Sequence, residues 1–129
     1  MPQSTKVTVV AAVVERDGCF LVTRRLEGTH LAGLWEFPGG KCEPGESHDA
    51  CLAREMFEEL GVGVAVDNLC LVETHAYGEL TVVLFFYGCQ LRGEPAPQLG
   101  QEMLWAPRAM LRELEFPPAD AKLIELLAG

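Results

Sequence analysis

The chain has 129 residues and a formal net charge of −9 at pH 7, with 10 Lys and Arg against 19 Asp and Glu. This length suits one domain, residues 1–129, with one core, and the hydrophobic fraction of 49% excludes a largely disordered chain. The strong negative charge disfavours binding to nucleic acid through its phosphates, and it suits a small phosphorylated substrate only if a divalent cation reverses the local field.

The sequence has no apolar stretch long enough to cross a bilayer, and its first residues do not resemble a secretion signal. The cysteines are scattered and contain no C-x-x-C pair, so their spacing indicates neither a disulfide framework nor a zinc site. They are Cys19, Cys42, Cys51, Cys70 and Cys89. We therefore expect a cytoplasmic protein with reduced thiols that does not bind a membrane.

The first part of the chain predicts a β-hairpin followed by a short strand. Residues 6–14 are β-branched and almost continuously apolar, which is typical of a strand buried on both faces. Residues 19–23 form the predicted returning strand after a glycine-containing turn. A polar loop over residues 26–34 then leads to a short strand, Trp35–Phe37, which ends at Pro38.

Residues 48–60 are predicted to form a helix, because Ser47 is a suitable N-cap and Gly61 a suitable C-terminal stop. The other predicted elements are a short extended piece at 62–66, strands at 69–76, 80–91 and 103–106, and helices at 107–114 and 119–127. The side chains expected to face the core are Ala50, Ala53, Phe57 and Leu60 in the first helix and Leu123, Leu126 and Leu127 in the last. This order of elements predicts an α/β sandwich with a mixed sheet.

The predicted helix over residues 48–60 carries three glutamates on one side. At about 100° per residue, Glu58 and Glu59 both lie within about 60° of Glu55 around the helix axis. Carboxylates at such spacings repel one another, and a solvated acidic face is the ordinary explanation for them. Arg54 inside the cluster and Glu46 in the preceding glycine-rich loop instead favour a site for a hard cation such as Mg²⁺ or Mn²⁺.

The stretch from Gly40 to Val62 matches the pattern G-x5-E-x7-R-E-U-x-E-E-x-G-U, where U is a bulky apolar residue. The fixed positions are filled by Gly40, Glu46, Arg54, Glu55, Met56, Glu58, Glu59, Gly61 and Val62. By this pattern the chain resembles the Nudix hydrolases. Four further segments are similar to the MutT-like branch, the enzymes of the 8-oxo-dGTP diphosphatase and CTP pyrophosphohydrolase type: Thr23–Arg25, Trp35–Lys41, Gly93–Pro95 and Phe116–Ala119.

The resemblance implies a Nudix α/β/α sandwich with a mixed β-sheet between helices. It also implies Mg²⁺-dependent hydrolysis of a (deoxy)nucleoside triphosphate to monophosphate and pyrophosphate, with Mn²⁺ as a substitute for Mg²⁺. The implied metal ligands are the carbonyl of Gly39 and the carboxylates of Glu55, Glu58 and Glu59. Glu46 and Arg54 would be paired and would shape the loop. The general base is expected before the last short strand, where Leu99 stands in the place of the glutamate of many relatives and Glu102 is the nearby candidate.

The resemblance also implies substrate-binding residues. Arg25 and His30 match positions near the nucleotide, Lys41 could reach a phosphate, and Phe37 lies at the mouth of the expected site. Asp120 stands where MutT enzymes have asparagine. An ionised aspartate only accepts hydrogen bonds and suits an exocyclic amine such as that of cytosine, whereas a protonated one could serve an oxidised guanine. Capping of the last helix by Asp120 remains an open alternative.

The leading hypothesis is therefore an enzyme that removes an oxidised or modified nucleotide, 8-oxo-dGTP or a 5-substituted (d)CTP, from the nucleotide pool and so supports DNA repair. The alternatives are a hydrolase of another nucleoside diphosphate derivative, such as a nucleotide sugar or ADP-ribose, and a non-catalytic nucleotide-binding module. The complete set of glutamates disfavours the binding module. The expected partner is a small nucleotide, for a monomer or a homodimer.

Overall fold

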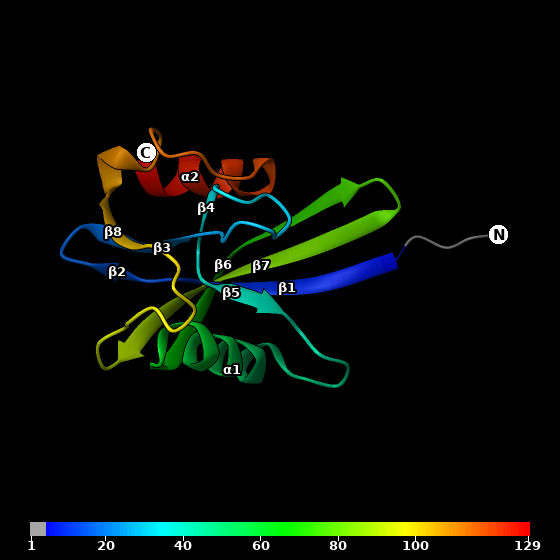
Figure 1. Cartoon of the computed structure of the whole chain (residues 1–129), viewed down its shortest axis with the longest axis horizontal. Helices are drawn as coiled ribbons and strands as arrows, with labels where there is room; N and C mark the ends of the chain where they lie inside the picture. The colour runs from blue at the N-terminus through cyan, green and yellow to red at the C-terminus, as the bar shows by residue number, and fades with distance from the viewer. Residues whose placement is uncertain (1–4) are drawn as a thin grey trace.

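The computed structural model describes residues 5–129, which form two β-sheets between two helices (Figure 1). The first sheet has the order β5-β1-β7-β6 and contains β1 (Thr5–Val13), β5 (Gly39–Lys41), β6 (Gly63–Tyr77) and β7 (Leu80–Arg92). The second joins β2 (Glu15–Arg16), β3 (Cys19–Arg24), β4 (Trp35–Glu36) and β8 (Met103–Pro107). The helices α1 (His48–Leu60) and α2 (Ala121–Ala128) lie on opposite sides, which confirms the predicted α/β/α sandwich.

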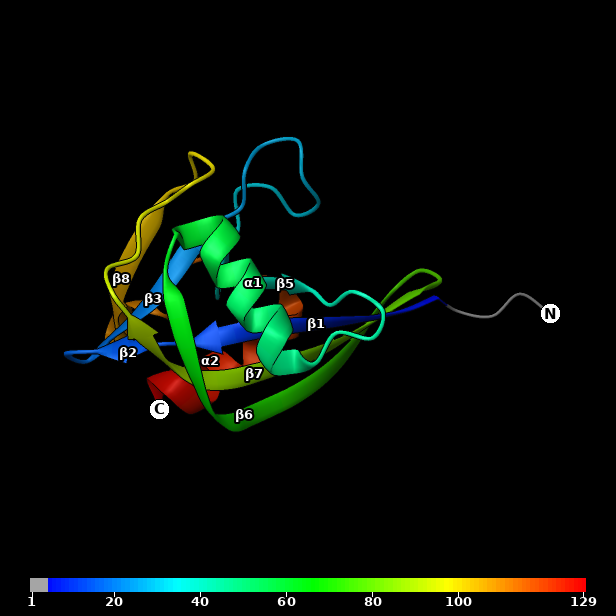
Figure 2. The ribbon, with the colours of Figure 1, turned by 90° about the horizontal axis from the view of Figure 1, so that it is seen from below.

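The first sheet is mixed, because β1 runs parallel to β7 and antiparallel to β5. The short strand β5 places Gly39 opposite Ala11 of β1. A Cβ atom added to Gly39 would lie 2.0 Å from the carbonyl oxygen of Val10, so a side chain at this position would prevent the pairing. Figure 2 shows α1 lying across this sheet, with the loop after β5 leading into its N-terminal end.

The hydrophobic core has two parts, one on each face of the first sheet. Side chains of a strand alternate between faces, so β1 contributes Val10 and Ala12 to the part beneath α1 and Ala11 and Val13 to the other. The α1 side holds Cys51, Leu52, Met56 and Leu60, and the α2 side holds Phe37, Phe86, Leu123 and Ile124. Both helices are therefore held by the burial of apolar side chains against a shared sheet.

Three predictions of local structure were wrong in detail. The segments 62–66 and 69–76 belong to one strand, β6, which has register shifts between Val66 and Leu71. The predicted helix 107–114 is only a 3₁₀ turn, Arg108–Met110, followed by further turns. The backbone N–H of Trp35 donates to the carbonyl of Glu115, at 2.8 Å, which ties the end of this turn-rich segment to β4. The last helix begins at Ala121 after a 3₁₀ turn, Pro118–Asp120.

The core-facing sides of the helices were also predicted incorrectly in part. The side chain of Phe57 is 67% exposed, because the row of Leu52, Met56 and Leu60 faces the sheet instead. Leu126 is 61% exposed, while Leu123 is buried as expected. Among residues 5–129, no helix is long and apolar enough to cross a membrane.

Candidate active site

A cavity of about 440 Å³ lies on the face of the first sheet that carries Val9 and Phe86, beneath the loop over residues 26–34. All of the predicted substrate-binding residues line it, namely Arg25, His30, Phe37, Lys41 and Asp120. Gly39, Gly40 and Glu55 line the same cavity. The structure therefore brings one predicted metal ligand of α1 and the backbone of β5 into the space where the predicted nucleotide-binding residues meet.

The position of α1 follows from its caps and from the glycines before it. The hydroxyl of Ser47 accepts from the N–H of Ala50 at 3.1 Å, and Gly61 ends the helix in the left-handed conformation with φ of 61°. A Cβ atom added to Gly40 would lie 2.3 Å from the carboxyl carbon of Glu55. The absence of a side chain at Gly40 thus allows the Glu55 carboxylate to lie directly against β5.

Arg54 links the glycine-rich loop to the glutamates. Its guanidinium donates to both carboxylate oxygens of Glu46, at 2.8 and 2.9 Å, so the ion pair that the resemblance implies is present. It also donates to Glu55 at 2.9 Å, to Glu58 at 3.4 Å and to the carbonyl of Lys41 at 3.1 Å. The hydrogen bonds from Arg54 lower the pKa of Glu46 to about 2, which keeps the pair charged.

Glu59 projects from the same helix toward the second sheet. It lines a smaller cavity of about 130 Å³ together with Thr23, Glu36 and Leu99. Its Oε2 atom is buried and has no hydrogen-bond partner among residues 5–129. Burial, followed by the neighbouring carboxylates of Glu55 and Glu36, raises the pKa of Glu59.

These carboxylates fit a hard divalent cation. A buried carboxylate oxygen without a partner, beside a second carboxylate, is costly, and a coordinated cation would satisfy it. Glu59 supplies the buried oxygen without a partner, and Glu55 is the second carboxylate. Glu58 differs from them, because its side chain is 56% exposed.

Glu36 is a residue of this site that the sequence analysis did not single out. It lines both cavities and forms an ion pair with Arg25 at 3.0 Å. Burial raises the pKa of Glu36, and Arg25 opposes this shift. Arg25 also donates to the carbonyl of His30 and so holds the loop over the cavity. A charged residue between Trp35 and Phe37, in a short apolar strand, was the available signal in the sequence.

Asp120 is buried in the wall of the larger cavity, with 5% of its surface exposed. Burial, followed by the charge of Glu36, raises the pKa of Asp120 to about 7. Asp120 stands at the N-terminal end of α2, but its side chain makes no capping hydrogen bond there. The ring of Tyr77, which packs edge-on against His30 at 5.2 Å between centroids, lines the same cavity. The geometry therefore favours the recognition hypothesis over the capping alternative.

Two predicted site residues lie differently from the rest. Glu102 accepts a hydrogen bond from Arg24 at 3.0 Å, and it lines neither of the two cavities described. Phe37 contributes to the cavity wall, but it is almost fully buried and stacks on Phe116 at 5.4 Å between ring centroids. Glu102 thus pairs with Arg24, which itself lines the smaller cavity together with Glu59, and Phe37 packs mainly in the core.

Comparisons with known proteins agree with this geometry. The sequence profile of the NUDIX domain matches residues 9–126. The chain is 39% identical over 127 residues to the 8-oxo-dGTP diphosphatase of Haemophilus influenzae, in an alignment that covers 95% of this chain and 92% of that protein. It is 33% identical over 120 residues to the CTP pyrophosphohydrolase of Escherichia coli, covering 92% and 89% of the two.

A solved structure also resembles this chain. The solution structure of the E. coli ORF135 protein superposes on this chain with a TM-score of 0.84 at 33% identity, covering 94% of this chain and 87% of that one. The profile match spans most of the chain, and both relatives align with it over nearly their whole lengths. The chain therefore belongs to the Nudix hydrolase family, as an enzyme of its MutT-like branch.

Proposed function

We propose that this enzyme is a Mg²⁺-dependent pyrophosphohydrolase that cleaves an oxidised or modified (deoxy)nucleoside triphosphate to the monophosphate and pyrophosphate. The candidate substrates are 8-oxo-dGTP and a 5-substituted (d)CTP, which the enzyme would remove from the cytoplasmic nucleotide pool. The observation that carries the proposal is the single cavity of about 440 Å³ that joins Glu55 and Gly39 to Asp120. The names of the two relatives, a diphosphatase of 8-oxo-dGTP and a pyrophosphohydrolase of CTP, support both candidates.

The residues around this cavity suit the two ends of a nucleotide. Glu55, Glu59 and the carbonyl of Gly39 would hold the cation, with Glu58 at the outer edge. Mg²⁺ bound there would neutralise phosphate oxygens and polarise the attacking water. Lys41 and Arg25 supply positive charge to the same space, which a triphosphate requires in a chain with a net charge of −9.

The base end is assigned to Asp120. With its pKa raised to about 7, this carboxyl populates both protonation states near neutral pH. The protonated form donates a hydrogen bond to a base carbonyl, and the ionised form accepts one from an exocyclic amine. An enzyme with such a residue can bind an oxidised guanine and a cytosine, which is consistent with both candidates.

The proposal is tested by measuring kcat/KM with Mg²⁺ for CTP, 5-methyl-dCTP, dGTP, 8-oxo-dGTP and 2-hydroxy-dATP, with pyrophosphate as the detected product. We expect the highest value for 8-oxo-dGTP or 5-methyl-dCTP. Release of inorganic phosphate in place of pyrophosphate would contradict the assigned bond. If ADP-ribose or a nucleotide sugar were hydrolysed faster than every triphosphate, the substrate class would be wrong.

A further inference from the structure

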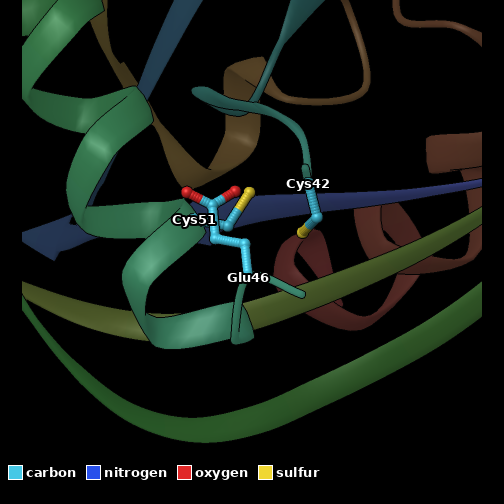
Figure 3. Close-up of side chains that lie close together, drawn as sticks. All are labelled: Cys42, Glu46 and Cys51. Atoms are coloured by element: carbon cyan, nitrogen blue, oxygen red, sulfur yellow. The ribbon is translucent and has the colours of Figure 1, made fainter. Parts of the chain in front are cut away.

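Outside the catalytic cavity, the thiols of Cys42 and Cys51 lie beside the carboxylate of Glu46 (Figure 3). One ligand atom from each residue, two sulfurs and one oxygen, lies within 4.8 Å of the other two. Cys42 follows β5 and Cys51 lies in the first turns of α1, so the turn between them folds the two thiols together. The spacing of the cysteines in the sequence did not indicate a zinc site, because eight residues separate Cys42 from Cys51. The two thiols meet only because the chain turns between them.

The cluster is accessible from solvent on one side. Cys42, Glu46 and His48 line a cavity of about 470 Å³ that is separate from the catalytic one. Cys51 is fully buried behind them, and its thiol lies 3.8 Å from the carbonyl oxygen of Gly40. A cation can therefore enter from the cavity, and a water molecule in the cavity can complete its coordination.

The donor atoms differ from those of the catalytic site. Thiolate sulfur is soft and prefers Zn²⁺ or another thiophilic ion, whereas Mg²⁺ prefers oxygen. Zinc takes sulfur at about 2.3 Å and carboxylate oxygen at about 2.0–2.2 Å, so tetrahedral coordination requires only a modest closure of the three atoms. We infer that Cys42, Cys51 and Glu46 form a second cation site that binds Zn²⁺, with water as the fourth ligand.

Formation of the site is balanced in charge. Zn²⁺ displaces one proton from each thiol, and both protons pass to solvent. The two thiolates and the Glu46 carboxylate then face Zn²⁺ and the guanidinium of Arg54, which donates to Glu46 at 2.8 and 2.9 Å. Because Arg54 also donates to Glu55, the site lies one contact away from the catalytic glutamates.

The test uses the full chain, freed of metal by a chelator, and Co²⁺ as a spectroscopic probe for Zn²⁺. We expect a thiolate-to-metal absorption band that saturates with one equivalent of Co²⁺ and is abolished by Zn²⁺. Co²⁺ held by the carboxylates of α1 gives no such band, so the result is independent of the catalytic proposal. Cys42→Ser should remove the band and weaken Zn²⁺ binding by more than about 10-fold. Cys70→Ser, which removes an exposed thiol of β6, serves as the matched control and should leave both unchanged.

A second measurement needs no variant. Alkylation of the unmodified protein, followed by mass spectrometry, gives the labelling rate of each cysteine, and Zn²⁺ should protect Cys42 but not Cys70. The inference is overturned if Co²⁺ gives no thiolate band with the unmodified protein. It is overturned equally if the band survives in Cys42→Ser, or if Zn²⁺ leaves the labelling rate of Cys42 unchanged.

Discussion

Replacement of Asp120 by asparagine tests the electrostatics of the base end of the cavity. The change keeps the shape of the side chain and removes its charge. Burial and Glu36 raise the pKa of Asp120 from 3.8 to about 7 in the folded protein. The folded state therefore binds this proton more tightly than the unfolded state does, so the carboxyl lowers the stability of the protein as pH rises from about 4 to about 7.

The magnitude follows from this difference in pKa. Each tenfold change in proton affinity is worth about 1.4 kcal/mol, so full ionisation of Asp120 costs the folded state about 4 kcal/mol, of which about 3 kcal/mol falls between about pH 5 and about pH 8.5. The amide of an asparagine at this position cannot ionise. The free energy of unfolding of Asp120→Asn, relative to the unmodified protein, should therefore rise by about 3 kcal/mol over that pH range.

The assay is urea unfolding of both proteins without metal at the two pH values. The charged and titratable groups that share the cavity wall with Asp120 include Glu36, Arg25, Tyr77 and His30, and they are present in both proteins. Asp67→Asn, which removes an exposed carboxylate, controls for the change in net charge. If the difference in unfolding free energy between Asp120→Asn and the unmodified protein is the same at both pH values, Asp120 is ionised throughout and the reasoning fails.

Three further predictions concern catalysis, specificity and packing. Glu59→Gln should keep the circular dichroism spectrum and reduce kcat by on the order of 10²-fold or more, because a ligand of the cation is lost; unchanged turnover would refute the metal role. Asp120→Asn should shift the kcat/KM ranking from cytosine nucleotides toward 8-oxo-dGTP, and an unchanged ranking would remove Asp120 from base recognition. Met56→Ala should lower the free energy of unfolding by about 2–5 kcal/mol, whereas Phe57→Ala, at an exposed position of the same helix, should change it by less than about 1 kcal/mol. Equal losses of unfolding free energy in the two variants, measured by urea unfolding, would contradict the observed burial of Met56 and exposure of Phe57.

The features predicted well from the sequence are those determined by neighbouring residues. Helix α1 begins after Ser47 and ends before Gly61 as expected, because a cap acts within one turn of the helix. The side of α1 that faces the sheet was predicted less well. A stripe through Phe57 and one through Met56 are both apolar, and only contact with the first sheet decides which is buried. Likewise, the segment after β8 is tied to β4 by a hydrogen bond between Trp35 and Glu115, which are far apart in the sequence, and local propensity does not predict such a contact.

For the same reason, the reaction class is easier to predict from the sequence than the substrate specificity. The cation site comes from one helix and the loop before it, so its residues lie within a short stretch that the sequence displays as a pattern. The base end is assembled from separate elements, with Glu36 from β4, Tyr77 from β6 and Asp120 from the turn before α2. The sequence leaves open whether Asp120 is protonated, because the pKa of its carboxyl depends on burial and on Glu36. Substrate preference in this enzyme should therefore respond to substitutions around Asp120 that leave the catalytic pattern unchanged.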